Sequence, residues 1–299
     1  MNASTFLSTW AAEGRVAAQD DSWCAQRGGR GIDGAGGVSM PARGGRDRMM
    51  AAGDYNHRRS VLTAGIERDG FAIVPELLTT AEVDALKRAI ADLAGTAPAD
   101  SVRRRRGAAY AMRNLLELSP EVRALARGKS ILSNARSVIG PTAFPVRATL
   151  FDETLDNNWP VAWHQDVTIA VRERREAPEF ERWSVKAGVI HVQPPDAILE
   201  GMLAVRLHLD PCGADNGALR VIPGSHCSGR LEDDAHDEWV ARGPIVCCSA
   251  PAGAGLLLRP LLLHASSPTQ RPAHRRVIHI EYAATPLPGG LRWTGQPFA

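Results

Sequence analysis

The chain has 299 residues, 44% of them hydrophobic and 23% charged, which is enough apolar material for a large core in one or two domains. Its 35 basic and 33 acidic residues leave a net charge of +2, which is too near zero to indicate a nucleic-acid or membrane-surface partner. The sequence contains no run of about 18 apolar residues that could cross a bilayer, and its start lacks the apolar core of a signal peptide.

The cysteines indicate the cellular compartment. There are five, Cys24, Cys212, Cys227, Cys247 and Cys248, an odd number without the spacing of a zinc finger. Such a set predicts free thiols in a reducing environment, not a disulfide framework. We therefore expect a soluble, cytoplasmic protein, and nothing in the sequence specifies its oligomeric state.

Residues 1–58 differ from the rest of the chain in composition. Nine of the 28 glycines lie in the first fifty positions, so this part offers little apolar surface to offset the entropy of ordering. We predict a disordered or loosely ordered extension over 1–58 and a single domain over 59–299. One hypothesis is that translation starts at Met49 or Met50, in which case a chain that begins there keeps its melting temperature and activity.

The domain is predicted to begin with a short apolar strand at 69–75. Thr79 and Glu82 have the spacing of a capping box, and the helix that they begin is expected to end near Gly95. Its apolar residues recur at helical spacing: Val83, Leu86, Ile90 and Leu93. An arginine-rich loop is expected at 103–106.

Ser119 and Pro120 have the form of an N-cap followed by proline at the first helical position. One or two further helices are expected up to Gly140, with an apolar stripe of Leu125, Ile131, Leu132, Val138 and Ile139. Short β-rich runs then continue to the end, at 144–151, 185–193, 202–209, 218–222, 255–258 and 277–283. This order predicts a mainly β, α+β domain: a double-stranded β-helix (jelly roll, cupin-like) of about eight strands with the N-terminal helices outside it.

His164 and Asp166 are the centre of the predicted site. In an extended stretch, side chains two residues apart point to the same face, so both can reach one metal ion. Trp159 and Trp163 flank them and favour a dry environment, in which a carboxylate needs a cation partner. His264, 98 residues after Asp166, is the best candidate for a third ligand. Two imidazoles and one carboxylate with open coordination positions are typical of non-haem Fe(II) oxygenases.

Two alternatives compete with this interpretation. A His-x-Asp pattern also arises by chance on surface strands, and His226, in the turn after Pro223, is the main rival of His264 among nine histidines. What favours His264 is the sequence after it, because Ser266 and the cation Arg275 follow. A dicarboxylate cosubstrate needs a permanent cation near the metal, and a guanidinium binds a carboxylate through two hydrogen bonds.

Strand alternation divides residues 275–282 into two faces. One is apolar enough to pack under the helices: Arg276, Ile278, Ile280 and Tyr282. The other suits a polar barrel interior: Arg275, Val277, His279 and Glu281. Arg275 is therefore the predicted cation of the site, and the alternative is that both arginines are solvated at the strand end.

Several motifs also occur in a characteristic order over about residues 65–290: Trp163–Asp166, Trp183–Gly188, His191–Pro195, Arg206–Asp210, Asn216–His226 and His264–Arg275. In this order they resemble the phytanoyl-CoA dioxygenase family of Fe(II)- and 2-oxoglutarate-dependent oxygenases. The resemblance implies Fe(II), 2-oxoglutarate and O2 as cofactor and cosubstrates. It implies hydroxylation, or a related oxidation such as desaturation, of a small molecule with release of succinate and CO2.

The resemblance also implies roles for single residues. His164, Asp166 and His264 would be the iron ligands and hence the catalytic centre. The distal carboxylate of 2-oxoglutarate would be held by Arg275 with Ser266 beside it, and the cosubstrate pocket would be lined by Thr149 and Trp183. Arg113 would lie near the cosubstrate or substrate, with a core or surface role equally open. His226 would then be a structural turn residue.

The substrate is left open, including whether it is CoA-linked or free. The charged stretch 172–182 could form a lid that selects an anionic molecule, or it could be a solvated loop. Two other functional classes are considered. One is a metal-binding, cupin-like jelly roll that acts as an isomerase or hydrolase. The other is a non-catalytic binding protein, which is disfavoured because all three candidate ligands and Arg275 are present.

Overall fold

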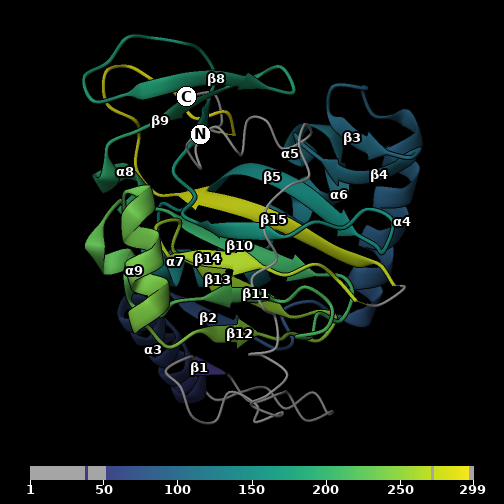
Figure 1. The fold of residues 1–299 in the computed structure, drawn as a ribbon, viewed down its shortest axis with the longest axis horizontal. Coiled ribbons are helices and arrows are strands. Elements are labelled where there is room, and N and C mark those ends of the chain that lie inside the picture. Colours follow the sequence, from purple (N-terminus) through teal and green to yellow (C-terminus); the bar gives the residue numbers. More distant parts are fainter. Residues whose placement is uncertain (1–37, 40–51, 271–272, 296–299) are drawn as a thin grey trace.

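The computed structural model describes residues 38–39, 52–270 and 273–295. Two sheets face each other, and a smaller third sheet lies above them in the view of Figure 1. The major sheet contains, in order across it, β1 (Val38–Ser39), β2 (Phe71–Val74), β13 (Gly255–Leu258), β10 (Leu203–His208), β15 (Arg275–Ala283), β5 (Phe144–Glu153), β4 (Ala108–Met112) and β3 (Val102–Arg105). The minor sheet contains β12 (Val246–Cys248), β11 (Leu219–Val221), β14 (His264–Ser266) and β6 (Val161–His164). The third sheet contains β7 (Ile169–Val171), β9 (Val189–Gln193) and β8 (Glu181–Lys186).

The helices cover the outside of this sandwich. They are α3 (Ala52–Asp69), α4 (Thr80–Thr96), α5 (Leu115–Leu118), α6 (Pro120–Arg127), α7 (Lys129–Ile139), α8 (Asp196–Glu200) and α9 (Asp233–Arg242), with a 3-10 turn at Ser225–Ser228. One core cluster joins helices α3 to α7 to the outer face of the major sheet, where Ile278, Ile280 and Tyr282 project from β15. The Tyr282 hydroxyl donates to the carbonyl of Ala126 in α6 at 2.8 Å. The expected jelly roll with N-terminal helices outside it is therefore confirmed.

A second cluster fills one end of the space between the two main sheets. Phe71 and Leu256 from the major sheet pack there with Leu219 and Val221 from the minor sheet. Burying these side chains stabilises the sandwich by roughly 1.5–3 kcal/mol each. The other end of the same interior is polar, and it holds the site described below.

Two of the predicted helix starts are present with their caps. Thr79 Oγ1 accepts from Glu82 N at 3.2 Å, and Glu82 Oε2 accepts from Thr79 N at 2.8 Å, which completes a capping box for α4. The Ser119 hydroxyl accepts from the backbone N–H of Val122 at 3.2 Å and caps α6. The predicted apolar stripe divides into α6 and α7 at Gly128.

One expectation differs from the structure. The stretch 103–106 is not a loop, because Val102–Arg105 forms strand β3 of a hairpin with β4. Its turn is Arg106-Gly107, where φ values of 49° and 84° match the two-residue turns that suit the twist of a hairpin. Helix α3 begins at Ala52, before residue 59, and the division into an extension over 1–58 and a domain over 59–299 stays a prediction. Residues 1–37 and 40–51 of the expected extension lie outside the described residues.

A strand that precedes Met49 bears on the hypothesis that translation starts there. Val38 and Ser39 of β1 pair in parallel with Ala72 and Ile73 of β2, so a chain that begins at Met49 lacks this pairing.

In the ranges that the structure describes, no helix is both long enough and apolar enough to cross a membrane.

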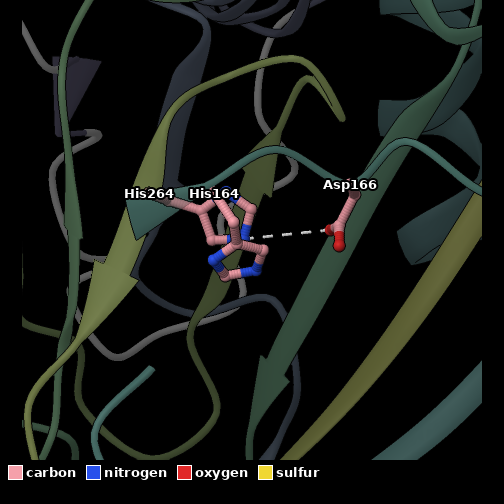
Figure 2. A group of neighbouring side chains, drawn as sticks. All are labelled: His164, Asp166 and His264. Atoms are coloured by element: carbon pink, nitrogen blue, oxygen red, sulfur yellow. Dashed lines mark ion pairs between the residues drawn. The ribbon is translucent and has the colours of Figure 1, made fainter. Parts of the chain in front are cut away.

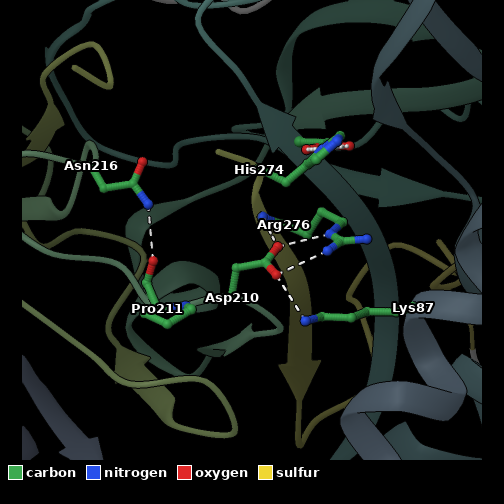
Figure 3. A network of polar contacts seen from close by, with 7 residues as sticks. Lys87, Asp210, Pro211, Asn216, His274 and Arg276 are labelled. Atoms are coloured by element: carbon green, nitrogen blue, oxygen red, sulfur yellow. Dashed lines mark hydrogen bonds and ion pairs between the residues drawn. The ribbon is translucent and has the colours of Figure 1, made fainter. Parts of the chain in front are cut away.

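An ion-pair network holds β15 in its register on the sheet (Figure 3). Asp210, which follows β10, accepts hydrogen bonds from Arg276 Nε at 2.7 Å and Nη2 at 2.9 Å, and it pairs with Lys87 of α4 at 2.9 Å. Burial acts to raise the pKa of Asp210, but the hydrogen bonds from Arg276 and Lys87 outweigh it and hold that pKa below its ordinary value. Because Arg276 is held on the outer side, its neighbour Arg275 must face the interior.

We expect the substitution Asp210→Asn to lower the free energy of unfolding by about 2 kcal/mol, since hydrogen bonds to charged groups contribute about 1.5–3 kcal/mol. The lowered pKa means that the wild-type contribution is complete at neutral pH and is lost as the pH falls below the usual range of aspartate. Urea unfolding at neutral and at acid pH should show the difference shrinking in acid. Asp84→Asn, an exposed change on the same helix as Lys87, should cost little. Equal losses in the two variants would contradict the assignment.

Candidate metal centre

Two neighbouring strands of the minor sheet bring the three predicted ligands together. β6 ends at His164, and β14 begins at His264, which lies opposite His164 in an antiparallel register. The imidazole rings are 4.2 Å apart between centroids, and Asp166 Oδ2 lies 3.9 Å from His264 Nε2 (Figure 2). One ligand atom from each residue lies within 4.8 Å of the other two, close enough for a single ion to bind all three.

The backbone fixes which nitrogen of each histidine faces the metal position. His164 Nδ1 lies 2.8 Å from the carbonyl of Ala162, and His264 Nδ1 lies 2.8 Å from the carbonyl of Leu262. A carbonyl only accepts, so each Nδ1 carries the proton and donates it. Each Nε2 is then left with a free lone pair, which is the usual arrangement for a histidine that binds a metal through Nε2.

The charge states of these residues suit a cation. Burial and the neighbouring His164 lower the pKa of His264 to about 3, so its imidazole is neutral at pH 7. Desolvation acts to raise the pKa of Asp166, but the nearby imidazoles of His264, His279 and His164 outweigh it and keep that pKa below its usual range. The site therefore presents the neutral imidazole of His264 and the carboxylate of Asp166 beside Nε2 of His164, a donor set that suits a cation.

The three ligands line a cavity of about 320 Å³ between the sheets. Thr149, Ser266, Arg275 and Arg113 also line it. Trp183 does not, which corrects the expectation for that residue. Its ring packs against a separate core cluster and lies 5.5 Å from the guanidinium of Arg174.

The rival histidine lies elsewhere. His226 is in the 3-10 turn, where its Nε2 lies 3.2 Å from the carbonyl of Glu67 and its ring lies against Gly70. It is therefore a structural turn residue. The charged stretch 172–182 contributes no residue to the lining of the cavity, and its Glu173 pairs with Arg292 at 2.7 Å.

Arg275 is buried and faces the cavity, but it already has a partner. Its guanidinium forms an ion pair with Glu153, which is equally buried and lies directly opposite it on β5. A second guanidinium, that of the partly buried Arg206, also lines the cavity, close enough to act on Glu153 and Arg275, with Nη1 at 3.5 Å from His279 Nδ1. Two positive charges and one negative charge therefore occupy this end of the cavity.

Sequence reasoning missed several lining residues: Arg147, Glu153, Lys186 and Arg206. Arg147 and Glu153 could have been found, because alternation along β5 places them on one face with Thr149 and Phe151. Alternation along the strand at 203–208 similarly turns Arg206 away from the outer core. Lys186 carried no such signal, since a bulge interrupts β8 before it.

A double-stranded β-helix that brings two histidines and an aspartate to one point defines the class of mononuclear metal sites used by non-haem iron oxygenases. The sequence matches the description "Phytanoyl-CoA dioxygenase (PhyH)" over residues 66–277, and the chain belongs to this family.

Solved structures with the same fold are similar over most of the chain. AviO1 from Streptomyces viridochromogenes Tue57 is 25% identical, with 77% of this chain and 98% of that chain covered and a TM-score of 0.55. EctD from S. alaskensis with 2-oxoglutarate and 5-hydroxyectoine is 20% identical, with 86% and 89% covered and a TM-score of 0.61. The α-ketoglutarate-dependent epimerase SnoN from nogalamycin biosynthesis is 19% identical, with 82% and 96% covered and a TM-score of 0.60. No curated protein matches the sequence significantly.

Proposed function

We propose that the chain is an Fe(II)- and 2-oxoglutarate-dependent oxygenase that hydroxylates a small-molecule substrate with release of succinate and CO2. The observation that carries the proposal is the convergence of His164, Asp166 and His264 with both Nε2 lone pairs free. Membership of the family supports it. The SnoN structure in complex with Fe3+ and α-ketoglutarate and the EctD structure with 2-oxoglutarate suggest the same pair of cofactors for this chain.

The donor set fits iron. His164, Asp166 and His264 would hold the ion, and two histidines with one carboxylate are the donor set that non-haem Fe(II) oxygenases use with open coordination positions. When bound, iron and the keto acid supply the oxidation of a C–H bond by O2. The chain contributes the Nε2 atoms of His164 and His264, whose rings are oriented by the backbone carbonyls of Ala162 and Leu262. Asp166 supplies the negative charge that offsets part of the charge of the ion.

The end of the cavity around Arg275 fits the distal carboxylate of the cosubstrate. Glu153 engages one side of the guanidinium, whereas the buried Nε of Arg275 has no hydrogen-bond partner among the described residues. An arginine presents five N–H donors, so an incoming carboxylate has donors available. Arg206 supplies the second positive charge that a second carboxylate needs, and Ser266 offers a hydroxyl.

Hydroxylation is the outcome that we propose because Asp166 completes the ligand set. The similar structures include one described as an epimerase and one as a carbocyclase, so the fold by itself does not specify the reaction. A cavity of about 320 Å³ suits a small molecule. A cytoplasmic location is also part of the proposal, because Cys212, Cys227, Cys247 and Cys248 are free thiols.

The test is anaerobic addition of Fe(II) and then 2-oxoglutarate to the metal-free protein. A weak visible charge-transfer band should appear only when both are present, because the keto acid must chelate the bound iron. Fe(II) alone is the control. A folded protein that binds Fe(II) but shows no band and releases no succinate would belong to the rival class of cupin-like isomerases or hydrolases.

A further inference from the structure

We propose that Arg113, Arg147 and Lys186 form a second anion site at the opposite end of the cavity from Arg275, and that it binds an oxyanion group of the substrate. The substrate is then a small carboxylate or phosphate ester. That the bound anion is a substrate rests on the function proposed above. The anion site itself rests only on the geometry of the cavity.

The register of β15 on β5 separates two charged ends. Arg275 lies opposite Glu153, and Glu281, six residues further along β15, lies opposite Arg147. At about 3.3 Å per residue, the two ends are about 20 Å apart. His279, opposite Thr149, lies between them, and both line the cavity beside the metal ligands. A short diacid held by Arg275 cannot also reach Arg147.

The far end carries more positive charge than the protein neutralises. Arg113, Arg147 and Lys186 all line the cavity, and the charges of Arg147, Arg113 and Glu281 act on Lys186. The carboxylate at this end is that of Glu281, which pairs with Arg147 at 2.6 Å. Lys186 is 9% exposed, and neither it nor the Arg113 side chain has a hydrogen-bond or ion-pair partner within residues 52–270 and 273–295.

These cations repel one another. Burial, with the charges of Arg147 and Arg113, lowers the pKa of Lys186 to about 8. Burial, with the charges of Arg103 and Arg147, lowers the pKa of Arg113 to about 10. His191 also lines this end, and burial and the same cations hold its pKa well below the usual range, so it adds no charge.

An unpaired buried charge destabilises the folded state, and the side chains of Lys186 and Arg113 have no partner among the described residues that would offset this cost. Groups whose pKa is shifted by burial and by like charges gather at binding sites, where the cost is offset when the ligand arrives. The ligand that offsets three cations and one carboxylate is an anion. Phosphate groups and carboxylates both bind guanidinium and ammonium groups through charged hydrogen bonds.

The experiment measures thermal unfolding of the metal-free protein with inorganic phosphate or acetate added at constant ionic strength. Lys186→Met keeps the length of the side chain and removes its charge. Lys129→Met, an exposed change on α7, is the matched control. No iron or 2-oxoglutarate is present, so the result is independent of the charge-transfer test above.

We expect phosphate or acetate to raise the melting temperature of the wild type and of Lys129→Met by several degrees. Lys186→Met should lose most of this shift. It should also melt about 2–4 °C higher than the wild type without added anion, because an unpaired charge has been removed. A larger shift with phosphate indicates a phosphate ester, and a larger shift with acetate indicates a carboxylate. Equal shifts in all three proteins, or no shift in the wild type, would overturn the proposal.

Discussion

Replacing His264 with alanine should weaken Fe(II) binding by more than about 100-fold and remove the charge-transfer band formed with 2-oxoglutarate. Partners that only orient metal ligands typically contribute about 10–100-fold in affinity, so the loss of a ligand must exceed that range. The variant keeps two protein ligands, His164 and Asp166, which bind an ion more weakly than three do. Anaerobic calorimetry with Fe(II), followed by absorption spectroscopy with 2-oxoglutarate, measures both effects.

The matched control is His226→Ala, which removes the histidine that competes with His264 in the sequence as the third metal ligand. His226 bonds the carbonyl of Glu67 and lies away from the cavity lining, so this variant should bind Fe(II) as the wild type does. A modest loss of stability is expected, since one hydrogen bond contributes about 0.5–1.5 kcal/mol. If His264→Ala keeps the affinity of the wild type, or if both variants lose it equally, the ligand set is wrong.

The sequence brings out the three candidate ligands because each signal lies within a short stretch of chain. Alternation in an extended stretch predicts a shared face for His164 and Asp166. In the structure β6 ends at His164, and Asp166 follows the strand but still lies near both imidazoles. His264 is recognised by Ser266 and Arg275 after it. Alternation also sorts Arg275 from Arg276 correctly, and the structure shows the reason, since Arg276 is held outside by Asp210.

What the sequence does not predict are the pairings between distant strands. Glu153 meets Arg275 only through the register of β15 on β5, which no pattern within either strand reveals. On β8 the alternation itself fails, because a bulge between Glu181 and Ser184, with Arg182 at φ 52°, changes which side chains face inward. Trp183, the expected lining residue, therefore packs outside the cavity, and Lys186 lines it.

The composition of the sequence also fails to predict helix α3. Its first residues belong to the stretch 1–58, whose composition predicts disorder, and its described apolar contacts with the core are those of Leu62 and Ile66. Two apolar residues four apart are too few to define a helical period. The helix is held by its packing against α7 and β2. These contacts form only when the chain folds, so no pattern within the helix itself reveals them.

The largest loss of stability is expected from Arg275→Met, at about 3–5 kcal/mol in the free energy of unfolding, because it leaves the carboxylate of Glu153 buried without its cation. Burial already raises the pKa of Glu153 above its ordinary value, although Arg275 opposes this. A carboxyl with a raised pKa destabilises the fold once the pH exceeds the range in which the unfolded chain titrates. The deficit of the variant should therefore be larger at pH 8 than at pH 5, as chemical denaturation at the two pH values would show.

Adding Glu153→Gln to Arg275→Met separates stability from cosubstrate binding. The double variant has no buried charge at this position, so its stability should return to about that of the wild type, as replaced buried ion pairs often do. Its affinity for 2-oxoglutarate should stay low, because the guanidinium that binds the distal carboxylate is gone, and calorimetry of the Fe(II)-loaded protein measures this. If the double variant recovers both stability and 2-oxoglutarate affinity, Arg275 serves only to neutralise Glu153, and Arg206 becomes the remaining cation for the cosubstrate at this end.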